Sequence, residues 1–375
     1  RLLTGTGRYT ADIKLPNMAH VAFRRSDHAH ARIIRIDTTV ARALPGVVGV
    51  YTAEDLRDRV TPLLASSKTA GAVSTAIRPL AEGKVRYVGE PVVAVVAENR
   101  YIAEDAVALI ELVLEALPAA SDPEAATRDD APLLHEAEGT NVLVERTLGR
   151  GDIDAVFPRA AVIVGGKFRM TRKSPSPMEC RACVADWDSG RRALKVHTST
   201  QQPGVIHDSI TRAFGLPGHR VRVTAPDVGG GFGSKGTLYP DEMTVCALAM
   251  MLGRPVKWIG DRLEDLISTN QAFDERVEAH LALDADGRIL GLRADAIGDA
   301  GAYSIFPWTA AMEPVQVISF LPGPYRVPAY RGRTRAVATP KTPMGAYRGV
   351  GRPTATFVME RLIDLGARKL GLDPL

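Results

Sequence analysis

Cysteine is scarce in this sequence. Only Cys180, Cys183 and Cys246 occur among 375 residues. An iron–sulfur cluster or a structural zinc site normally needs four protein ligands, so a single C-x-x-C pair with one distant cysteine argues against both. The simpler interpretation is three small residues in a reducing compartment, which favours a cytoplasmic protein.

Long apolar runs and a strong charge imbalance are also missing. The run from Pro91 to Ala97 is among the longest, far short of the ~20 residues of a membrane-spanning helix. The first residues, R-L-L-T-G, show no signal-peptide pattern, and because they lack Met we expect the natural start to be absent. The 47 basic and 43 acidic residues leave a net charge of +4, which predicts no nucleic-acid partner.

The order of apolar strands, helical patterns and one polar segment predicts an α+β fold in two domains. Residues 1–118 mix short apolar strands with helical patterns and form the first domain. Residues 119–150 are polar and punctuated by proline, which predicts an exposed linker. Residues 151–375 form the second domain, and a chain of this length can give each domain its own core.

Strand and helix periods define the expected elements. Apolar runs predict strands at 21–23, 33–36, 47–51, 92–97, 161–168, 193–198 and 221–223, and Asp286-Gly287 predicts a hairpin joining 277–283 to 289–296. Helical spacing is found at 100–110, 205–214, 242–252 and after Pro353. Residues 112–117 fit either a longer helix or a strand.

The most informative segment is V-G-G-G-F-G-S-K-G, from Val228 to Gly236. It follows a predicted strand and precedes a predicted helix, so free backbone amides and a helix N-terminus can hold an anion there. Its spacing matches neither the Walker A loop nor the dinucleotide fingerprint. The alternative is a purely structural turn, although the lone Phe232 favours contact with something planar.

Two further segments are candidates for the same site. M-G-A-Y-R-G-V-G-R-P at 344–353 is a second glycine-rich loop before a helix, and Arg348 and Arg352 are either solvated or bind an oxyanion. T-S-T-Q-Q-P at 198–203 lies between a strand and a helix, where Ser and Thr ordinarily cap the helix and Gln201 can donate to an oxo ligand. His28 and His30 have metal-ligand spacing but are expected to be surface or packing residues.

In this order the segments resemble the molybdenum-binding large subunits of the xanthine oxidase family, which includes aldehyde oxidoreductases, carbon monoxide dehydrogenase and N-heterocycle hydroxylases. G-R-Y-T-A-D at 7–12, R-S-D-H-A-H-A at 25–31 and V-G-E-P-V at 88–92 look like its hammerhead domain. T-S-T-Q, the glycine loop and A-Y-R-G at 346–349 look like its first molybdopterin-binding domain. The resemblance covers nearly the whole chain, and the ordered set is more specific than any single motif.

This resemblance implies a molybdenum hydroxylase that oxidises an aldehyde or an N-heterocycle with oxygen from water. The implied cofactor is molybdenum on molybdopterin, extended as the cytosine dinucleotide, with no metal ligand from a protein side chain. Electrons would pass to iron–sulfur and FAD centres. This chain lacks the cysteines for the clusters, so iron–sulfur and FAD partner subunits are implied in a heteromeric complex.

The resemblance also implies residue roles. Gln201 would hydrogen-bond an oxygen ligand of the molybdenum, Phe232 would lie beside the metal and stack on an aromatic substrate, and Arg348 would stabilise negative charge in the transition state. These three are the implied catalytic residues. The implied cofactor-binding set is Gln201, Gly230, Gly231, Phe232, Gly233, Arg348 and Gly349.

Departures from the family pattern narrow the expectation. Gly349 stands where copper-containing carbon monoxide dehydrogenases carry a Cys, which argues against carbon monoxide oxidation. Gly236 stands where purine oxidases carry a substrate-facing Glu, which argues against a xanthine-type substrate. The family's general base is a Glu of a second molybdopterin-binding domain that this sequence does not include. Either a partner chain supplies that half or the sequence is a fragment.

Two other functions stay open. One is a non-catalytic, truncated homologue that serves as an assembly or binding module. The other is a phosphate-binding enzyme that uses an ordinary nucleotide. Molybdenum in the native complex would favour the hydroxylase, and nucleotide binding without a pterin would favour the last alternative.

Overall fold

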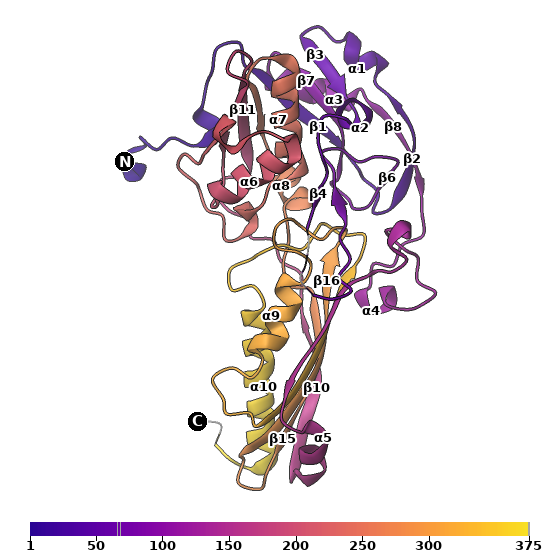
Figure 1. Cartoon of the computed structure of the whole chain (residues 1–375), viewed down its shortest axis with the longest axis vertical. Helices are drawn as coiled ribbons and strands as arrows, with labels where there is room; N and C mark the ends of the chain where they lie inside the picture. Colours follow the sequence, from indigo (N-terminus) through magenta and orange to yellow (C-terminus); the bar gives the residue numbers. More distant parts are fainter. Residues whose placement is uncertain (66, 68, 374–375) are drawn as a thin grey trace.

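Two lobes, one above the other in Figure 1, make up the molecule, and the chain passes repeatedly between them. The computed structural model describes residues 1–65, 67 and 69–373. The upper lobe, which we call the seven-stranded lobe, takes its elements mainly from residues 19–116 and 182–268. The lower, five-stranded lobe takes residues 142–170 and 275–370.

The elements have the following bounds. The strands are β1 (Ala19–Arg25), β2 (Ala31–Asp37), β3 (Val47–Tyr51), β4 (Leu63–Leu64), β5 (Ala76–Ile77), β6 (Lys84–Val85), β7 (Pro91–Ala97), β8 (Glu111–Ala116), β9 (Val142–Arg150), β10 (Val162–Met170), β11 (Ala182–Asp188), β12 (Ala193–Thr198), β13 (Val221–Thr224), β14 (Val256–Ile259), β15 (Glu275–Leu283), β16 (Ile289–Gly301) and β17 (Ala329–Ala338). The α-helices are α1 (Thr39–Ala43), α2 (Ala53–Leu56), α3 (Arg100–Ala108), α4 (Pro123–Ala126), α5 (Ile153–Val156), α6 (Pro203–Phe214), α7 (Pro240–Leu252), α8 (Arg262–Ser268), α9 (Met312–Phe320) and α10 (Arg352–Leu370).

The large sheet joins two distant parts of the sequence. Its strand order is β13-β12-β11-β14-β1-β7-β3, so three N-terminal strands continue a sheet begun by four strands from the second half. The two sets meet at a parallel pair in which Ala19 lies opposite Val256. The region 1–118 therefore completes a sheet of the region that follows it.

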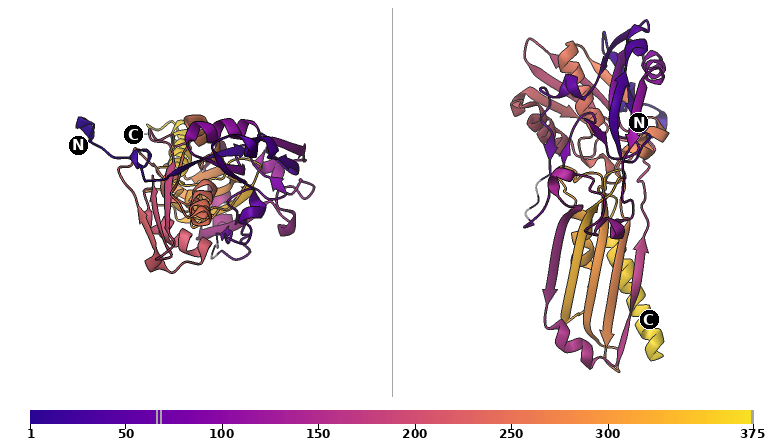
Figure 2. Two further views of the ribbon diagram at one scale, coloured as in Figure 1. Left: turned by 90° about the horizontal axis from the view of Figure 1, so that it is seen from above. Right: turned by 90° about the vertical axis from the view of Figure 1, so that its right-hand side faces the viewer.

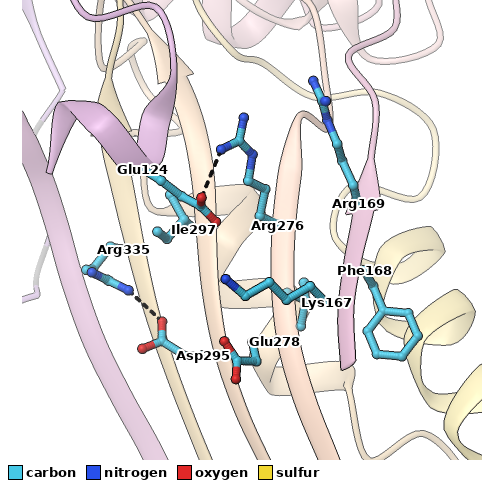
Figure 3. A pocket seen from close by; sticks show the side chains of 10 residues that line it. Glu124, Lys167, Phe168, Arg169, Arg276, Glu278, Asp295, Ile297 and Arg335 are labelled. Carbon is cyan, nitrogen blue, oxygen red and sulfur yellow. Dashed lines mark hydrogen bonds and ion pairs between the residues drawn. The ribbon is translucent and has the colours of Figure 1, made fainter. Parts of the chain in front are cut away.

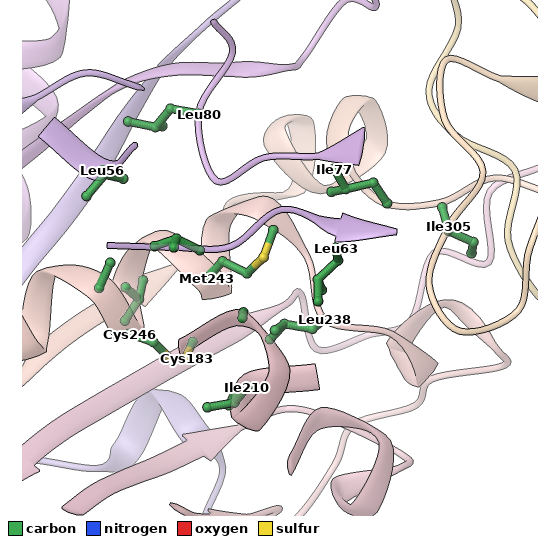
Figure 4. Close-up of a cluster of buried hydrophobic side chains, with 14 of the residues drawn as sticks. Leu56, Leu63, Ile77, Leu80, Cys183, Ile210, Leu238, Met243, Cys246 and Ile305 are labelled. Atoms are coloured by element: carbon green, nitrogen blue, oxygen red, sulfur yellow. The ribbon is translucent and has the colours of Figure 1, made fainter. Parts of the chain in front are cut away.

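The core of the seven-stranded lobe is centred on α7. This helix is apolar on all sides and lies between β11 and the segment of residues 53–80 (Figure 4). Leu80 packs on one side of Met243, and Cys183 packs near Cys246 on the other. A helix that is hydrophobic all round is stable only when it is enclosed, which explains why the N-terminal segment covers it.

The five-stranded sheet has its two long helices on one face, and only the short helices α4 and α5 contact the other. Its order is β10-β15-β16-β17-β9, and α9 and α10 pack along one side (Figure 2). Residues that point toward these helices are mostly apolar; Phe168, for example, meets Phe357 of α10 edge-on at 6.0 Å between ring centres. The other face carries the alternate, charged residues, as expected for a sheet with one solvated side.

Most expected elements are confirmed, and one open choice is decided. The strands, the helices and the hairpin with Gly287 at its turn all form, and residues 112–117 lie mainly in the strand β8. The prediction of an exposed linker over 119–150 is wrong for its last nine residues. These form β9, an edge strand in which Leu143 is buried. Its other residues are mostly polar and exposed, which is why it resembled a linker.

Candidate functional site

The predicted Gln201 segment and the glycine loop form one unit. The Gln201 amide donates to the Lys235 carbonyl oxygen at 3.1 Å, and the Gly233 amide donates to Gln201 Oε1 at 2.9 Å. A Cβ added at Gly231 would collide with the same Gln201 oxygen, so the Gln201 side chain lies directly against the glycine backbone. Residues 32 positions apart are thereby fixed against each other.

The second glycine-rich loop joins this unit. Gly233 has a φ of +110°, and a Cβ there would collide with the carbonyl oxygen of Ala346. Behind Ala346, the Tyr347 ring meets the Phe273 ring edge-on at 5.6 Å between centres. Gly233 belongs to the seven-stranded lobe and the loop of Ala346 leads into α10 of the five-stranded lobe. All three predicted segments therefore meet where the two lobes join.

The glycine loop presents unpaired backbone donors. The amides of Gly230, Gly231 and Phe232 make no hydrogen bond within the described part of the chain, whereas the flanking amides of Gly229 and Gly233 are bound to Glu179 and Gln201. Consecutive free amides of this kind make an anion-binding concavity. The Phe232 ring is 47% exposed, and its φ is +51°, so the loop holds an apolar ring away from any core.

The expectation that a helix N-terminus also serves this loop is wrong. The next long helix, α7, begins at Pro240, beyond a short turn over Ser234–Gly236. Its first turn carries Asp241 and Glu242, both buried, and Glu242 Oε2 accepts the Tyr239 amide at 3.1 Å. Because two carboxylates already occupy the positive end of α7, an anion at the loop would have only the loop amides as backbone donors.

Sequence reasoning missed the support behind the loop. Lys235 is 2% exposed, and its ammonium donates to Glu179 Oε2 at 3.0 Å, to the Glu179 carbonyl at 2.8 Å and to Ser199 Oγ at 2.6 Å. Glu179 Oε2 also accepts the Gly229 amide at 2.8 Å. Burial lowers the pKa of Lys235, while the facing Glu179 carboxylate opposes that shift. No local pattern around Glu179 indicates this role, because its partners lie 20 to 56 residues away.

The polar residues before α6 do not cap it, contrary to the default expectation. Gln202 is the N-cap residue and makes no side-chain capping bond. The Thr198 hydroxyl instead donates to Glu242 Oε1 at 2.7 Å, Ser199 to Glu179 Oε2 at 2.6 Å, and Thr200 to the Lys235 carbonyl at 2.8 Å. All three tie this segment to the glycine loop and α7.

Arg348 and Gly349 lie in the turn that follows Ala346. The Arg348 side chain is exposed and makes no hydrogen bond or ion pair within the described residues. Gly349 has a φ of +98°, and its carbonyl accepts the Arg352 amide at 3.1 Å as α10 begins. The fold thus brings Arg348 to the lobe junction, where its guanidinium has no partner among the residues that the structure describes.

The cysteine and histidine candidates have structural roles. Cys183 and Cys246 are fully buried, and their contact raises the pKa of the Cys183 thiol, which burial raises further. His30 is 5% exposed, and its Nδ1 lies 2.9 Å from the Pro118 carbonyl oxygen. Among the described residues no group of three His, Cys, Asp or Glu side chains could hold a metal, and no helix is long and apolar enough to cross a membrane.

A separate hollow of about 580 Å³ lies on the open face of the five-stranded sheet (Figure 3). Glu124 pairs with Arg276 at 3.3 Å and Asp295 pairs with Arg335 at 2.8 Å across it. None of the predicted site residues lines this hollow. It is therefore distinct from the lobe junction.

Comparison with known proteins places the chain in a family. A sequence model of the molybdopterin cofactor-binding domain matches residues 134–375, and one of the aldehyde oxidase and xanthine dehydrogenase a/b hammerhead domain matches residues 4–118. The chain belongs to the xanthine oxidase family of molybdopterin-binding proteins. The family assignment and the mixed α/β architecture predicted from the sequence are both confirmed.

Individual members of the xanthine oxidase family resemble the chain throughout. The nicotine 6-hydroxylase large subunit of Paenarthrobacter nicotinovorans is 38% identical over 100% of this chain and 46% of its own length. The carbon monoxide dehydrogenase large chain of Hydrogenophaga pseudoflava is 36% identical over 100% of this chain and 48% of its own. Quinoline 2-oxidoreductase from Pseudomonas putida 86 superposes with a TM-score of 0.96 at 42% identity, over 100% and 48%. The chain thus spans about half the length of these relatives.

The lobe junction has the groups that the family's cofactor requires. Molybdopterin carries a phosphate group, and the free amides of Gly230, Gly231 and Phe232 are donors of the type that binds phosphate or oxo oxygens. The exposed Arg348 side chain adds a guanidinium cation beside the same junction. A Cβ at Gly231 would meet the Gln201 side-chain oxygen and one at Gly233 the Ala346 carbonyl oxygen, so the glycines allow the three segments to pack this closely.

Proposed function

We propose that this protein supplies one wall of the active site of a molybdenum hydroxylase that oxidises an N-heterocycle, with an aldehyde as the second substrate class. In the overall reaction a ring C–H and one water become C–OH, and two protons and two electrons leave. The exposed Phe232 ring supports an aromatic substrate, since it offers a free face for stacking. The nicotine- and quinoline-oxidising relatives support the same class.

The cofactor in this proposal is molybdenum on molybdopterin, in the cytosine dinucleotide form. When bound, it supplies the oxygen transfer and accepts the two electrons. The amides of Gly230, Gly231 and Phe232 bind its oxygens, with Gly233 and Gly349 shaping the two loops around it. Arg348 offsets negative charge that develops beside the substrate.

One observation carries the proposal. The Gly233 amide donates to Gln201 Oε1, which fixes the orientation of the side-chain amide and leaves its Nε2 hydrogens free. A free, fixed NH₂ group beside three unpaired backbone amides is a donor set for an oxygen ligand. A structural turn would have no need for it.

The proposal includes partners and a location. A second molybdopterin-binding half, as a further part of this polypeptide or as a separate chain, supplies the general base. Iron–sulfur and FAD subunits carry the electrons away in a cytoplasmic complex. The relatives named as large subunits and chains support such an assembly.

The test starts with the native complex. We expect it to contain molybdenum and a pterin and to oxidise quinoline- or nicotine-type heterocycles. A molybdenum-free intact complex would contradict the proposal and favour the non-catalytic binding module. A bound nucleotide without a pterin would contradict it in favour of the phosphate-binding enzyme.

A single variant tests the role of the free NH₂ group of Gln201. Gln201→Glu keeps an acceptor for the Gly233 amide, replaces the free NH₂ donor with an oxygen and adds a negative charge. We expect the turnover number to fall by about 10²–10³, the usual loss for one such donor, with an unchanged unfolding midpoint. Glu278→Gln, the reverse exchange on the open sheet face, is the matched control and should retain full turnover. Equal turnover in both variants would remove the role of Gln201.

A further inference from the structure

Two buried carboxyl groups lie beneath the loop that carries Arg348. Glu275 begins β15 and is 1% exposed, and Glu313 lies in the first turn of α9 and is 0% exposed. They are neighbours: Glu275 lies opposite Gly298 in the sheet, and a Cβ on Gly298 would meet the ring of Pro314 at 2.5 Å. The Phe273 amide also donates to Glu313 Oε1 at 2.9 Å.

The surrounding cations are already matched by other carboxylates. Arg172 pairs with Asp274 at 3.3 Å and with Asp299 at 3.1 Å. Lys341 pairs with the same two aspartates at 2.9 and 2.6 Å. Two cations therefore face two aspartates, and no described residue forms an ion pair with Glu275 or Glu313. Two ionised carboxylates buried in this way would lack the compensation that burial requires.

The carboxyl oxygens of the pair are also short of hydrogen-bond donors. Both oxygens of Glu275 and Oε2 of Glu313 have no partner in the described structure, and Gln316 one turn along α9 has a buried, unpartnered Oε1. The Thr354 hydroxyl of α10 faces Glu275. Burial raises the pKa of Glu275 to about 8, and burial and then repulsion by Glu275 raise the pKa of Glu313 well above its ordinary value. Arg172 opposes this shift at Glu313, and Asp274 adds to it at Glu275.

The pair is connected to the Arg348 loop from both sides. A Cβ on Gly351 would collide with the backbone of Glu313 and Val317, so the end of the loop rests directly on α9. The Phe273 residue that binds Glu313 holds the Tyr347 ring at the start of the same turn. A change at the carboxyl pair therefore acts on both ends of the segment from Tyr347 to Gly351.

We propose that Glu275 and Glu313 are a proton-sharing acid pair that holds the loop from Ala346 to Gly351 against the glycine loop, and that loss of the proton releases this loop. They are positioning residues, since neither reaches the lobe junction itself. The shared proton replaces the cation that the pair lacks, and its loss puts two unscreened negative charges under the loop. This inference goes beyond the proposed function and does not depend on the cofactor.

The first experiment uses the unmodified native protein. Infrared spectra should show a protonated carboxylic acid C=O band at pH 7 that disappears by pH 10. Over the same range, amide hydrogen exchange across residues 345–351, corrected for the intrinsic rate, should rise at least about tenfold. The helix α6 is the internal reference and should keep its protection. A spectrum without a pH-dependent acid band would overturn the inference.

Variants connect the two signals to the pair. Glu275→Gln is a permanently neutral mimic of the protonated acid, so we expect part of the acid band to be lost and the loop to stay protected at pH 10. Glu313→Gln keeps an acceptor for the Phe273 amide and should act similarly. Glu278→Gln, three residues along β15 but on the open face, should behave as the unmodified protein. Loop exchange in Glu275→Gln that rises with pH as in Glu278→Gln would refute the inference.

Discussion

The two lobes differ in the charged residues that they enclose. In the seven-stranded lobe, Arg25 of β1 and the fully buried Arg181 both bind Asp241 at the start of α7. In the five-stranded lobe, ion pairs such as Arg331 with Asp154 lie on the open sheet face, while the buried Glu275 and Glu313 have no cation of their own. The seven-stranded lobe encloses this matched network, whereas the five-stranded lobe encloses the unmatched carboxyl pair beside the matched cluster of Arg172, Lys341, Asp274 and Asp299.

This difference follows from how each lobe is assembled. Arg25 comes from the N-terminal region and Asp241 and Arg181 from the second half, so the buried network fixes the register between two distant parts of the chain. Arg181 also stacks on Tyr239, with 3.9 Å from the guanidinium carbon to the ring centre. The five-stranded sheet also joins distant strands, β9 with β17 and β10 with β15, through their backbone ladders. Ion pairs along these strands, such as Arg333 with Glu145, are exposed. Buried charges here specify an assembly, and exposed ones serve the solvated surface.

The largest effect should come from breaking the buried network. Asp241→Ala leaves two buried arginines without their shared carboxylate, and we expect the free energy of unfolding to fall by about 3–5 kcal/mol. Urea denaturation of the native protein measures this. Asp154→Ala removes the exposed partner of Arg331 in the other lobe and should leave the unfolding midpoint unchanged. Equal losses in the two variants would erase the contrast between the lobes.

Phe23 and Phe232, both in the seven-stranded lobe, should differ strongly in how much stability is lost when each is replaced by alanine. Phe23 is 7% exposed and meets Trp258 edge-on, so Phe23→Ala should cost about 3–5 kcal/mol. Phe232 is 47% exposed, and Phe232→Ala should change the free energy of unfolding by about 0.5 kcal/mol while activity falls. Thermal unfolding and turnover of both variants separate the roles. A strongly destabilised Phe232→Ala protein would mean that the ring is core.

A smaller effect should come from placing a side chain between the two loops that meet at the lobe junction. Gly233→Ala forces a Cβ into the Ala346 carbonyl at a positive φ, and we expect a cost of about 1–3 kcal/mol and a lower molybdenum content. Gly166→Ala, in β10 of the five-stranded lobe, meets no atom within 4 Å and should be stabilising by up to about 0.5–1 kcal/mol. A neutral Gly233→Ala protein would contradict close contact between the loops.

The pH dependence of the free energy of unfolding tests the five-stranded lobe without a substitution. The pKa of Glu275 is about 8 in the folded protein against 4.5 ordinarily, so between these values the folded state holds a proton that the unfolded chain has released. Stability contributed by this proton is fully present below pH 4.5 and falls as pH rises toward 8, by at most ~1.4 kcal/mol per pH unit. Across this range the urea midpoint should depend less on pH in Glu275→Gln than in the unmodified protein. An unchanged slope would show that Glu275 is ionised throughout.

Local patterns gave the elements of this fold correctly where apolar spacing was clear. The DG turn, the apolar run of β7 and the face of α10 depend on near neighbours and were readable from the sequence alone. The edge strand β9 was not, because few of its side chains are buried and its pairing partner β17 lies about 190 residues away. The expectation that the N-terminus of α7 serves the anion failed for a local reason: Glu242, three residues from Tyr239, already accepts the Tyr239 amide.

By itself the sequence determined the family, the glycine loops and the candidate residues Gln201, Phe232 and Arg348, since motif order and residue type are local properties. Only the tertiary structure decided that these residues meet at one junction, with Lys235 and Glu179 beneath one loop and Glu275 and Glu313 beneath the other. Whether a charged side chain is enclosed, and whether a counter-charge reaches it, depends on contacts across the whole chain. The sequence specifies the chemical type of each residue, but the electrostatic environment of that residue is set only when the chain folds.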